Sequence, residues 1–176
     1  MKLITQKLLA GLEALLKNPS SAKFRIFNSL FPKMVPFNTG MGARLVYLDD
    51  NSIKVTLPNR RRNHNHLGTI HACAIATAGE MSAGLLLLRS FPLSKYRLIL
   101  KELKVTYKYQ AKLDLIAEAT LPSKIHDKAS AELHDTGAVE QKIKTLISDT
   151  EGNSIADITS VWQLKSWDKV RTKSPK

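Results

Sequence analysis

Apolar residues near the start of the chain recur at the spacing of a helix. Over 2–17 they lie three and four positions apart and so share one helical face: Leu8, Leu9, Leu12, Leu15 and Leu16. A shorter helix is expected over 21–31, before Pro32 and Pro36. We expect residues 1–38 to form a helical extension packed on the main body. Its lysines and arginines leave open the alternative of a helix that lies on a membrane surface.

From residue 40 onward the pattern becomes the alternation of β-strands. A strand that opens near Gly40 and Gly42 is expected to pair with 52–57 through a turn at 49–51. Further strands are expected as a meander over 96–110, 113–121, 139–148 and 155–164, with a polar excursion at 123–137 and a hairpin turn at 149–153. The first of these strands changes parity, which predicts a β-bulge near Lys101 and Glu102.

The most apolar stretch runs from Ala72 to Leu88 and carries Glu80 at its centre. A membrane span needs about 20 apolar residues and tolerates a central carboxylate poorly, so we expect a buried helix. Strands, one buried helix and more strands indicate an α+β fold, with one long helix on a curved antiparallel sheet of about six strands. A helix that is apolar all round must be covered on every side, which favours a partner subunit.

Length and composition narrow the class of protein. The 176 residues predict one domain over 1–176, with a basic tail at 166–176, and 43% hydrophobic residues exclude a wholly disordered chain. A single cysteine, Cys73, excludes a disulfide framework within the chain, and no secretory signal is convincing, so a reducing, cytoplasmic location is expected. The net charge of +12 predicts attraction to polyanions: nucleic acid, anionic lipid or coenzyme A.

The segment 63–73 concentrates the candidate chemistry. His64, His66 and His71 lie close in sequence, but no carboxylate or thiol completes a metal site at standard spacing, so no metal is expected. The three arginines at 60–62 suggest phosphate binding, yet aromatic residues for base stacking are scarce around them.

Glu80 is the other chemical signal. A carboxylate in an apolar setting has a raised pKa, which is typical of functional sites, although pairing with a lysine is the structural alternative. Cys73 is expected to act as a buried small hydrophobic residue, with a nucleophilic role as the alternative.

Asn65, Gly68 and His71 at spacings of three, followed by Glu80 nine residues later, form a recognisable motif. It resembles that of the hot-dog-fold acyl-CoA thioesterases of the phenylacetate-pathway and hydroxybenzoyl-CoA type, and the helical extension resembles a less-characterised subgroup. The resemblance implies a hot-dog fold from about 40 to 165 and hydrolysis of an acyl thioester. It implies that Glu80 activates water or attacks directly, that the N–H of Ala72 polarises the carbonyl, and that Asn65 and His71 assist.

The resemblance also implies partners. Lys108 and Lys112, or alternatively Arg60, Arg61 and Arg62, would contact the phosphates of coenzyme A, which is part of the substrate; no separate cofactor is expected. Independently, nine residues of helix rise about 13.5 Å, so His71 and Glu80 of one chain cannot meet at one carbonyl. Two antiparallel helices from two chains could bring them together, which predicts a homodimer or a dimer of dimers.

Three residues depart from the family motif. Ala72 and Cys73 replace two glycines, and Gly84 replaces a serine or threonine. A non-catalytic acyl-CoA-binding module therefore remains an alternative, as does a basic protein that binds nucleic acid or a membrane surface.

Overall fold

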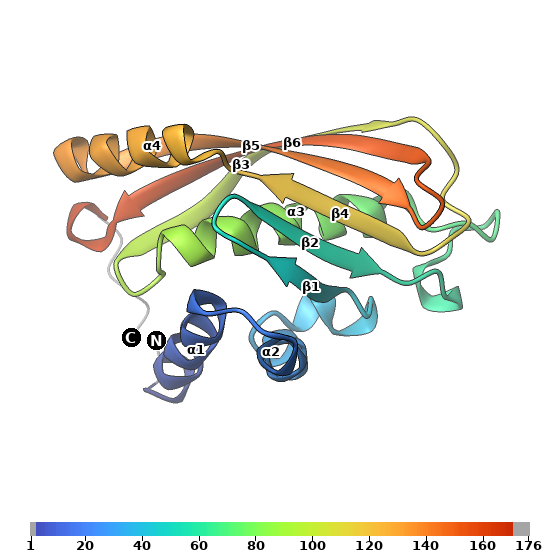
Figure 1. Cartoon of the computed structure of the whole chain (residues 1–176), viewed down its shortest axis with the longest axis horizontal. Coiled ribbons are helices and arrows are strands. Elements are labelled where there is room, and N and C mark those ends of the chain that lie inside the picture. Colours follow the sequence, from blue (N-terminus) through green and yellow to red (C-terminus); the bar gives the residue numbers. More distant parts are fainter. Residues whose placement is uncertain (1–2, 171–176) are drawn as a thin grey trace.

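The computed structural model describes residues 3–170, with side chains from residue 10 onward. Six antiparallel strands curve around one long helix, α3 (Ala72–Ser90) (Figure 1). The strands stand in the order β1-β2-β4-β5-β6-β3. Their bounds are β1 Arg44–Leu48, β2 Ser52–Leu57, β3 Tyr96–Tyr107, β4 Leu115–Thr120, β5 Ala138–Asp149 and β6 Ser154–Ser166. The predicted α+β architecture is confirmed.

Alternation of buried and exposed residues explains the strands. Along β2 every second side chain is buried, and Ile53 and Val55 lie opposite Ala119 and Ala117 of β4. β5 alternates in the same way over nearly its whole length. In β2 and β5 one parity therefore faces the core, while the other faces outward.

Small residues let α3 lie close to the sheet. A Cβ at Gly79 would overlap the side chain of Ile158, and one at Gly84 would lie 3.0 Å from the ring of Trp162. The helix is long and apolar enough to cross a membrane by length and composition, a test that core helices also pass. Here it packs against the concave face of the sheet, with ten of its nineteen residues buried.

The strand order differs from the expected meander. The segment from α3 into β3 crosses the concave face, so β3 reaches the far edge and pairs with β6 rather than β4. β4 instead pairs with β2 and β5. The predicted bulge is confirmed, since the β3–β6 register shifts between Leu100 and Glu102. The turn at 149–153 is also confirmed: the Asp149 carboxylate accepts the N–H groups of Glu151 and Asn153.

The polar excursion at 123–137 is a fourth helix, α4 (Ser123–Thr136). Its two buried residues, Ala129 and Leu133, are four apart and share one face, which is the signal that the sequence reading missed. Gly137 ends the helix in the left-handed conformation, at φ 74°. The helix lies along one end of the β-sheet (Figure 1).

Other boundaries also differ from the predictions. A 3-10 turn, η1 (Pro36–Gly40), precedes β1, so that strand begins at Arg44 rather than near Gly40. The start of the predicted basic tail is ordered as the end of β6 and a 3-10 turn (Trp167–Lys169), and the Trp167 indole N–H donates to the carbonyl of Leu93. Residues 171–176 lie outside the described part of the chain.

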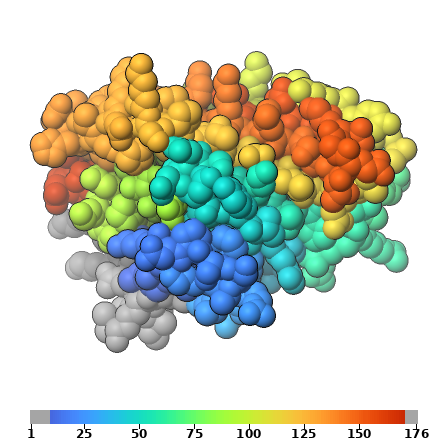
Figure 2. All heavy atoms as spheres, in the orientation of Figure 1, coloured from blue at the N-terminus to red at the C-terminus, as the bar shows by residue number. Residues whose placement is uncertain are grey.

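The helical extension is packed on the body, as predicted. Helix α1 (Leu3–Lys17) buries Leu12 and Leu16, and the Glu13 carboxylate accepts the N–H of Leu93. The predicted face residues Leu8 and Leu9 lie outside the described side chains. Helix α2 (Ser21–Met34) continues two residues beyond Pro32. In the space-filling view these blue helices lie beneath the teal β1–β2 hairpin, and orange α4 forms the opposite edge (Figure 2).

Helix α2 closes one edge of the sheet through Asn28. Its side-chain amide donates to the carbonyl of Leu45 at 2.9 Å and accepts the N–H of Leu45 at 2.8 Å, as a neighbouring strand would. The outward-facing backbone N–H and carbonyl of Leu45 in the edge strand β1 thereby have hydrogen-bond partners, which protects this edge from pairing with other chains.

We expect Asn28→Ala to lower the free energy of unfolding by about 2 kcal/mol, because two half-buried backbone groups lose their partners. Urea unfolding of this variant beside Ser29→Ala, an exposed neighbour, measures the effect. A loss no larger than that of the control would contradict this role for Asn28.

Candidate functional site

The loop before α3 is held rigidly by Asn63, which the sequence reading did not single out. Its side chain is 3% exposed and donates to the carbonyls of Met41 and Pro58 at 2.9 and 2.8 Å. Its own carbonyl accepts the N–H of His71 at 2.7 Å. These bonds fix the approach of the chain to the first turn of α3.

Asn65 shapes the next part of this loop. Its side-chain oxygen accepts the N–H of Leu67 at 2.9 Å, and its amide donates to the hydroxyl of Thr69 at 3.0 Å. Gly68 stands in the left-handed region, at φ 74°, which glycine adopts at little cost. The motif's asparagine and glycine thus have a conformational role beside any role in binding.

His71 is the N-cap of α3. Its Nδ1 accepts the N–H of Cys73 at 3.0 Å, so the neutral ring carries its proton on Nε2. Ala72 is the first residue of the helix, and within residues 3–170 its N–H has no hydrogen-bond partner. The Tyr107 hydroxyl donates to the Ala72 carbonyl at 2.9 Å and fixes this turn against β3.

A groove of about 340 Å³ opens beside this turn. Asn65, Thr69 and Ala72 line one side, and Tyr107, Lys108 and Tyr109 line the other. The structure therefore brings three predicted site residues, Asn65, Ala72 and Lys108, to one place. His71 adjoins the groove in sequence but does not line it, and Glu80 lies farther along α3.

Glu80 is partly buried, and burial raises the pKa of its carboxyl group. Within the described residues its carboxylate has no ion pair or hydrogen bond, so none of the described lysines is the partner that the structural alternative requires. A carboxylate left alone in an apolar setting is costly, because desolvation of the charge is not offset. This residue is therefore a functional candidate on physical grounds.

The raised pKa has a consequence for stability. The folded chain holds the Glu80 proton more tightly than the unfolded chain does. The stabilisation that this proton gives to the folded state is therefore complete below the pKa of an unfolded glutamate. It is lost as the pH rises through the raised pKa of the folded state.

We expect Glu80→Gln, which removes this titration, to raise Tm by about 2 °C at pH 7 and to leave it nearly unchanged at pH 4. Calorimetry at both values measures the difference. An equal change in Tm at the two values would show that the buried charge is not its source.

The predicted phosphate-binding residues do not form one cluster. Lys108 lines the groove, where its Nζ lies 2.7 Å from the Asp157 carboxylate. Lys112 follows β3, and its carbonyl accepts the side chain of Asn59 at 2.6 Å. Arg60 donates to the carbonyl of Gly40 and borders a separate cavity of about 320 Å³, which Arg61 and Arg62 do not line.

Cys73 is exposed, so the expectation of a buried small hydrophobic residue is wrong. Cys73 stands in the first turn of α3, where His71 and Ala72 are exposed as well. His64 is bound to Asn59, with Nε2 2.6 Å from Oδ1. Across the described part of the chain, no three histidine, cysteine or acidic side chains are placed to hold a metal ion.

Gly84 departs from the motif for a visible reason. The Trp162 ring occupies the space toward which a side chain at this position would point, and its indole N–H donates to Ser160. A hydroxyl-bearing residue at position 84 would require this ring to move.

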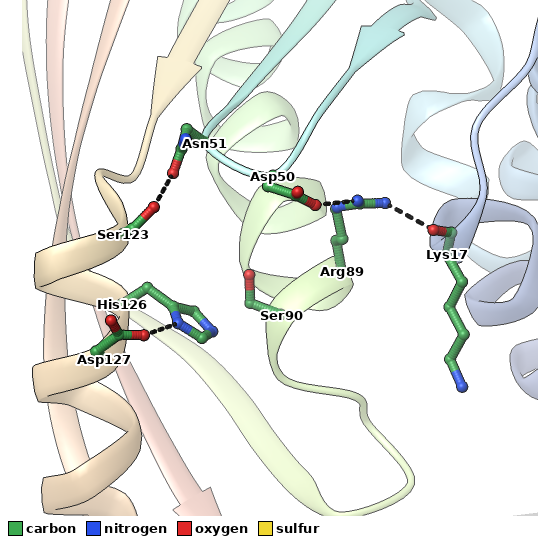
Figure 3. A pocket seen from close by; sticks show the side chains of 8 residues that line it. All are labelled: Lys17, Asp50, Asn51, Arg89, Ser90, Ser123, His126 and Asp127. Carbon is green, nitrogen blue, oxygen red and sulfur yellow. Dashed lines mark hydrogen bonds and ion pairs between the residues drawn. The ribbon is translucent and has the colours of Figure 1, made fainter.

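A second cavity, also of about 340 Å³, lies at the other end of α3 (Figure 3). Six of its eight lining residues form pairs: Arg89 with Asp50, Asn51 with Ser123 and His126 with Asp127. Arg89 also donates to the carbonyls of Leu16 and Lys17 at the end of α1. The contacts around this cavity therefore fasten the helical extension to the core.

Comparison with known proteins agrees with this architecture. The chain is similar to PA5026 of Pseudomonas aeruginosa, a "Protein of Unknown Function" also named "Probable Thioesterase", at 25% identity and a TM-score of 0.75 over 85% of this chain and 99% of that one. It is similar to thioesterase HI1161 of Haemophilus influenzae at 12% identity and a TM-score of 0.68, covering 90% of this chain and 99% of that one. A mutant of thioesterase PA1618 of Pseudomonas aeruginosa is similar at 14% identity and a TM-score of 0.67, over 86% of this chain and 99% of that one.

These likenesses confirm the hot-dog fold. No curated protein matches the chain. The model of DUF4442, described as a domain of unknown function, matches residues 24–164, which include α3, the groove and the sheet except for the last two residues of β6. The chain therefore belongs to the DUF4442 family.

Proposed function

We propose that this protein hydrolyses acyl thioesters, with acyl-CoA as the substrate, at a site completed by a second copy of the chain. The observation that carries the proposal is the pair of unpartnered groups on α3: the partly buried Glu80 carboxylate and the N–H of Ala72, neither of which has a partner within residues 3–170. A carboxylate can activate water as a general base, and a free N–H at a helix start can stabilise the oxyanion that forms from a thioester. The thioesterase names of PA5026 and HI1161 support the reaction class.

The need for a second copy follows from helix geometry. Ala72 and Glu80 stand on one helix about 12 Å apart along its axis, too far to act on one carbonyl. If two α3 helices lie antiparallel, Glu80 of one copy reaches the first turn of the other. Each of the two equivalent sites then contains one carboxylate and one helix start.

The sheet offers a suitable surface for such a dimer. The two edge strands are β1 and β3, and α2 already closes β1 through Asn28. β3 exposes Ile99, Leu103 and Tyr107 and has no neighbour on its outer side among the described residues. An exposed apolar edge strand is a template for pairing with another chain.

In the proposed reaction, Glu80 accepts a proton from water as the water oxygen attacks the thioester carbon. The N–H of Ala72, with the positive end of the α3 dipole behind it, stabilises the oxyanion that forms. Collapse of this intermediate breaks the carbon–sulfur bond, and the leaving thiolate takes the proton from Glu80. The products are a carboxylic acid and free coenzyme A, while His71 and Asn65 hold the first turn and the loop in place.

For the coenzyme A phosphates, the groove favours Lys108 and, beyond the end of β3, Lys112. Lys108 lies in the groove beside Ala72, whereas Arg60 borders a separate cavity. Arg60, Arg61 and Arg62 remain the alternative set.

A second candidate function is acyl-CoA binding without hydrolysis. Gly84, which faces the Trp162 ring, supplies no hydroxyl, and Ala72 and Cys73 narrow the approach to the helix start. Release of free thiol from acyl-CoAs with short, long and aromatic acyl groups separates the two functions.

A further inference from the structure

The surface formed by α2 and its neighbours has a charge unlike that of the rest of the chain. From Ala14 to Gly79 there are nine lysines and arginines and two acidic residues, Asp49 and Asp50. The exposed surface of α2 presents Arg25, Ile26 and Lys33. Ile26 and Lys33 lie seven residues, or about two turns, apart and so share one face, and Arg25 stands beside Ile26.

The turn η1 extends this surface. It packs against the end of α2, and the Thr39 hydroxyl donates to the Pro32 carbonyl at 3.1 Å. It carries Phe37, whose side chain is 77% exposed, and on α2 Ile26 is 50% exposed. Phe37 and Ile26 are therefore two large apolar side chains exposed to solvent near lysine and arginine side chains.

Two arginines flank η1 from the next part of the chain. Arg60 donates to the carbonyl of Gly40 at 2.7 Å, and Cδ of Arg62 lies 3.5 Å from where a Cβ on the same glycine would stand. Within residues 3–170 neither they nor Arg25 and Lys33 form an ion pair. We call Arg25, Ile26, Lys33, Phe37, Arg60 and Arg62 the α2 surface.

We propose that the α2 surface docks this protein on a bilayer that contains anionic lipids. The four cations face the headgroups, and Phe37 and Ile26 enter the boundary between headgroups and acyl chains. Binding of this kind combines electrostatic attraction with burial of apolar area, and both are present here. The pattern suits a bilayer better than RNA, since binding of single strands uses successive stacking aromatics and an isoleucine cannot stack.

The α2 surface stays free in the proposed dimer. α2 packs against β1, at the opposite edge of the sheet from β3, so pairing through β3 leaves it exposed. A dimer would carry two such surfaces, and simultaneous contact would strengthen binding to vesicles.

Sedimentation with vesicles tests the proposal independently of any enzymatic activity. The full chain should bind vesicles of phosphatidylcholine with phosphatidylserine, bind vesicles of phosphatidylcholine alone far more weakly, and lose affinity as salt is raised. Arg25→Glu with Lys33→Glu should lower the partition coefficient at least tenfold. Ile26→Ser with Phe37→Ser leaves the charge unchanged and should lower it by about tenfold.

The matched control is Lys124→Glu with Lys128→Glu on α4. These lysines are exposed, the change in net charge is the same, and α4 lies on the opposite side of the molecule from α2 (Figure 1). The partition coefficient of this variant should stay within about twofold of that of the parent protein. Circular dichroism and thermal melting establish that all variants are folded.

Two results would overturn the proposal. One is equal binding to the two kinds of vesicle, which would mean that anionic headgroups are not recognised. The other is unchanged vesicle binding by Ile26→Ser with Phe37→Ser, together with binding of single-stranded RNA that Arg25→Glu with Lys33→Glu removes. That combination would identify the surface as a site for polyanions in solution.

Discussion

Replacing Glu80 by glutamine is expected to lower the turnover of acyl-CoA at least about a hundredfold, the size typical of a lost general base. Glutamine keeps the volume of the side chain and cannot accept a proton from water. The pH dependence should carry the same signature. Because burial raises the pKa of Glu80, the rate should rise with pH through a range above that of an ordinary glutamate, as the carboxylate ionises.

Thiol release from a panel of acyl-CoAs measures this effect, with Glu118→Gln as the control. Glu118 is an exposed carboxylate that pairs with Lys54 on the outer face of the sheet, so its loss should leave turnover unchanged. Turnover that survives in Glu80→Gln would remove Glu80 from the reaction. No turnover by the parent protein on any member, with saturable binding of acyl-CoA, would favour the binding module.

Replacing Ala72 by proline is expected to lower kcat by about a hundredfold to a thousandfold, with a smaller effect on KM. Proline removes the N–H that is proposed to stabilise the oxyanion. It is well suited to the first position of a helix, and the preceding residue, His71, already has the extended backbone that proline requires, at φ −65° and ψ 140°. The fold should therefore be retained, which a thermal melt checks, and Ala72→Gly, which keeps the N–H, serves as the control.

A mixture of the two inactive variants shows whether one site draws on two chains. If Glu80 of one copy acts with Ala72 of the other, a mixed dimer has one site with both defects and one intact site. Refolding Glu80→Gln and Ala72→Pro chains together should then recover about a quarter of the parent activity. No recovery from dimers that demonstrably mix would place both groups in one chain and contradict the shared site.

Much of the fold could be read from the sequence because its signals are local. The alternation at 52–57, the apolar run of α3 and the change of parity near Lys101 each report which side of an element is buried. All three features are present in the structure. Helix α4 was missed because only Ala129 and Leu133 mark its buried face within a polar segment.

The candidate site was harder to read. The motif located Asn65, Ala72 and Glu80, yet the structure places only the first two at the groove of one chain. Asn63, which holds the loop through three hydrogen bonds, has no pattern of its own in the sequence, since its partners Met41 and Pro58 are near it only after folding.

The sequence by itself determined the type of the main elements other than α4, the burial of Glu80 in an apolar helix and the excess of positive charge. These follow from residue type and periodicity, which act over a few neighbouring positions. Only the tertiary structure decided that β3 crosses to the free edge beside β6, that Asn28 closes the other edge, and that Trp162 takes the space at Gly84. Each of these depends on contacts between residues 17 or more positions apart, which no local pattern specifies.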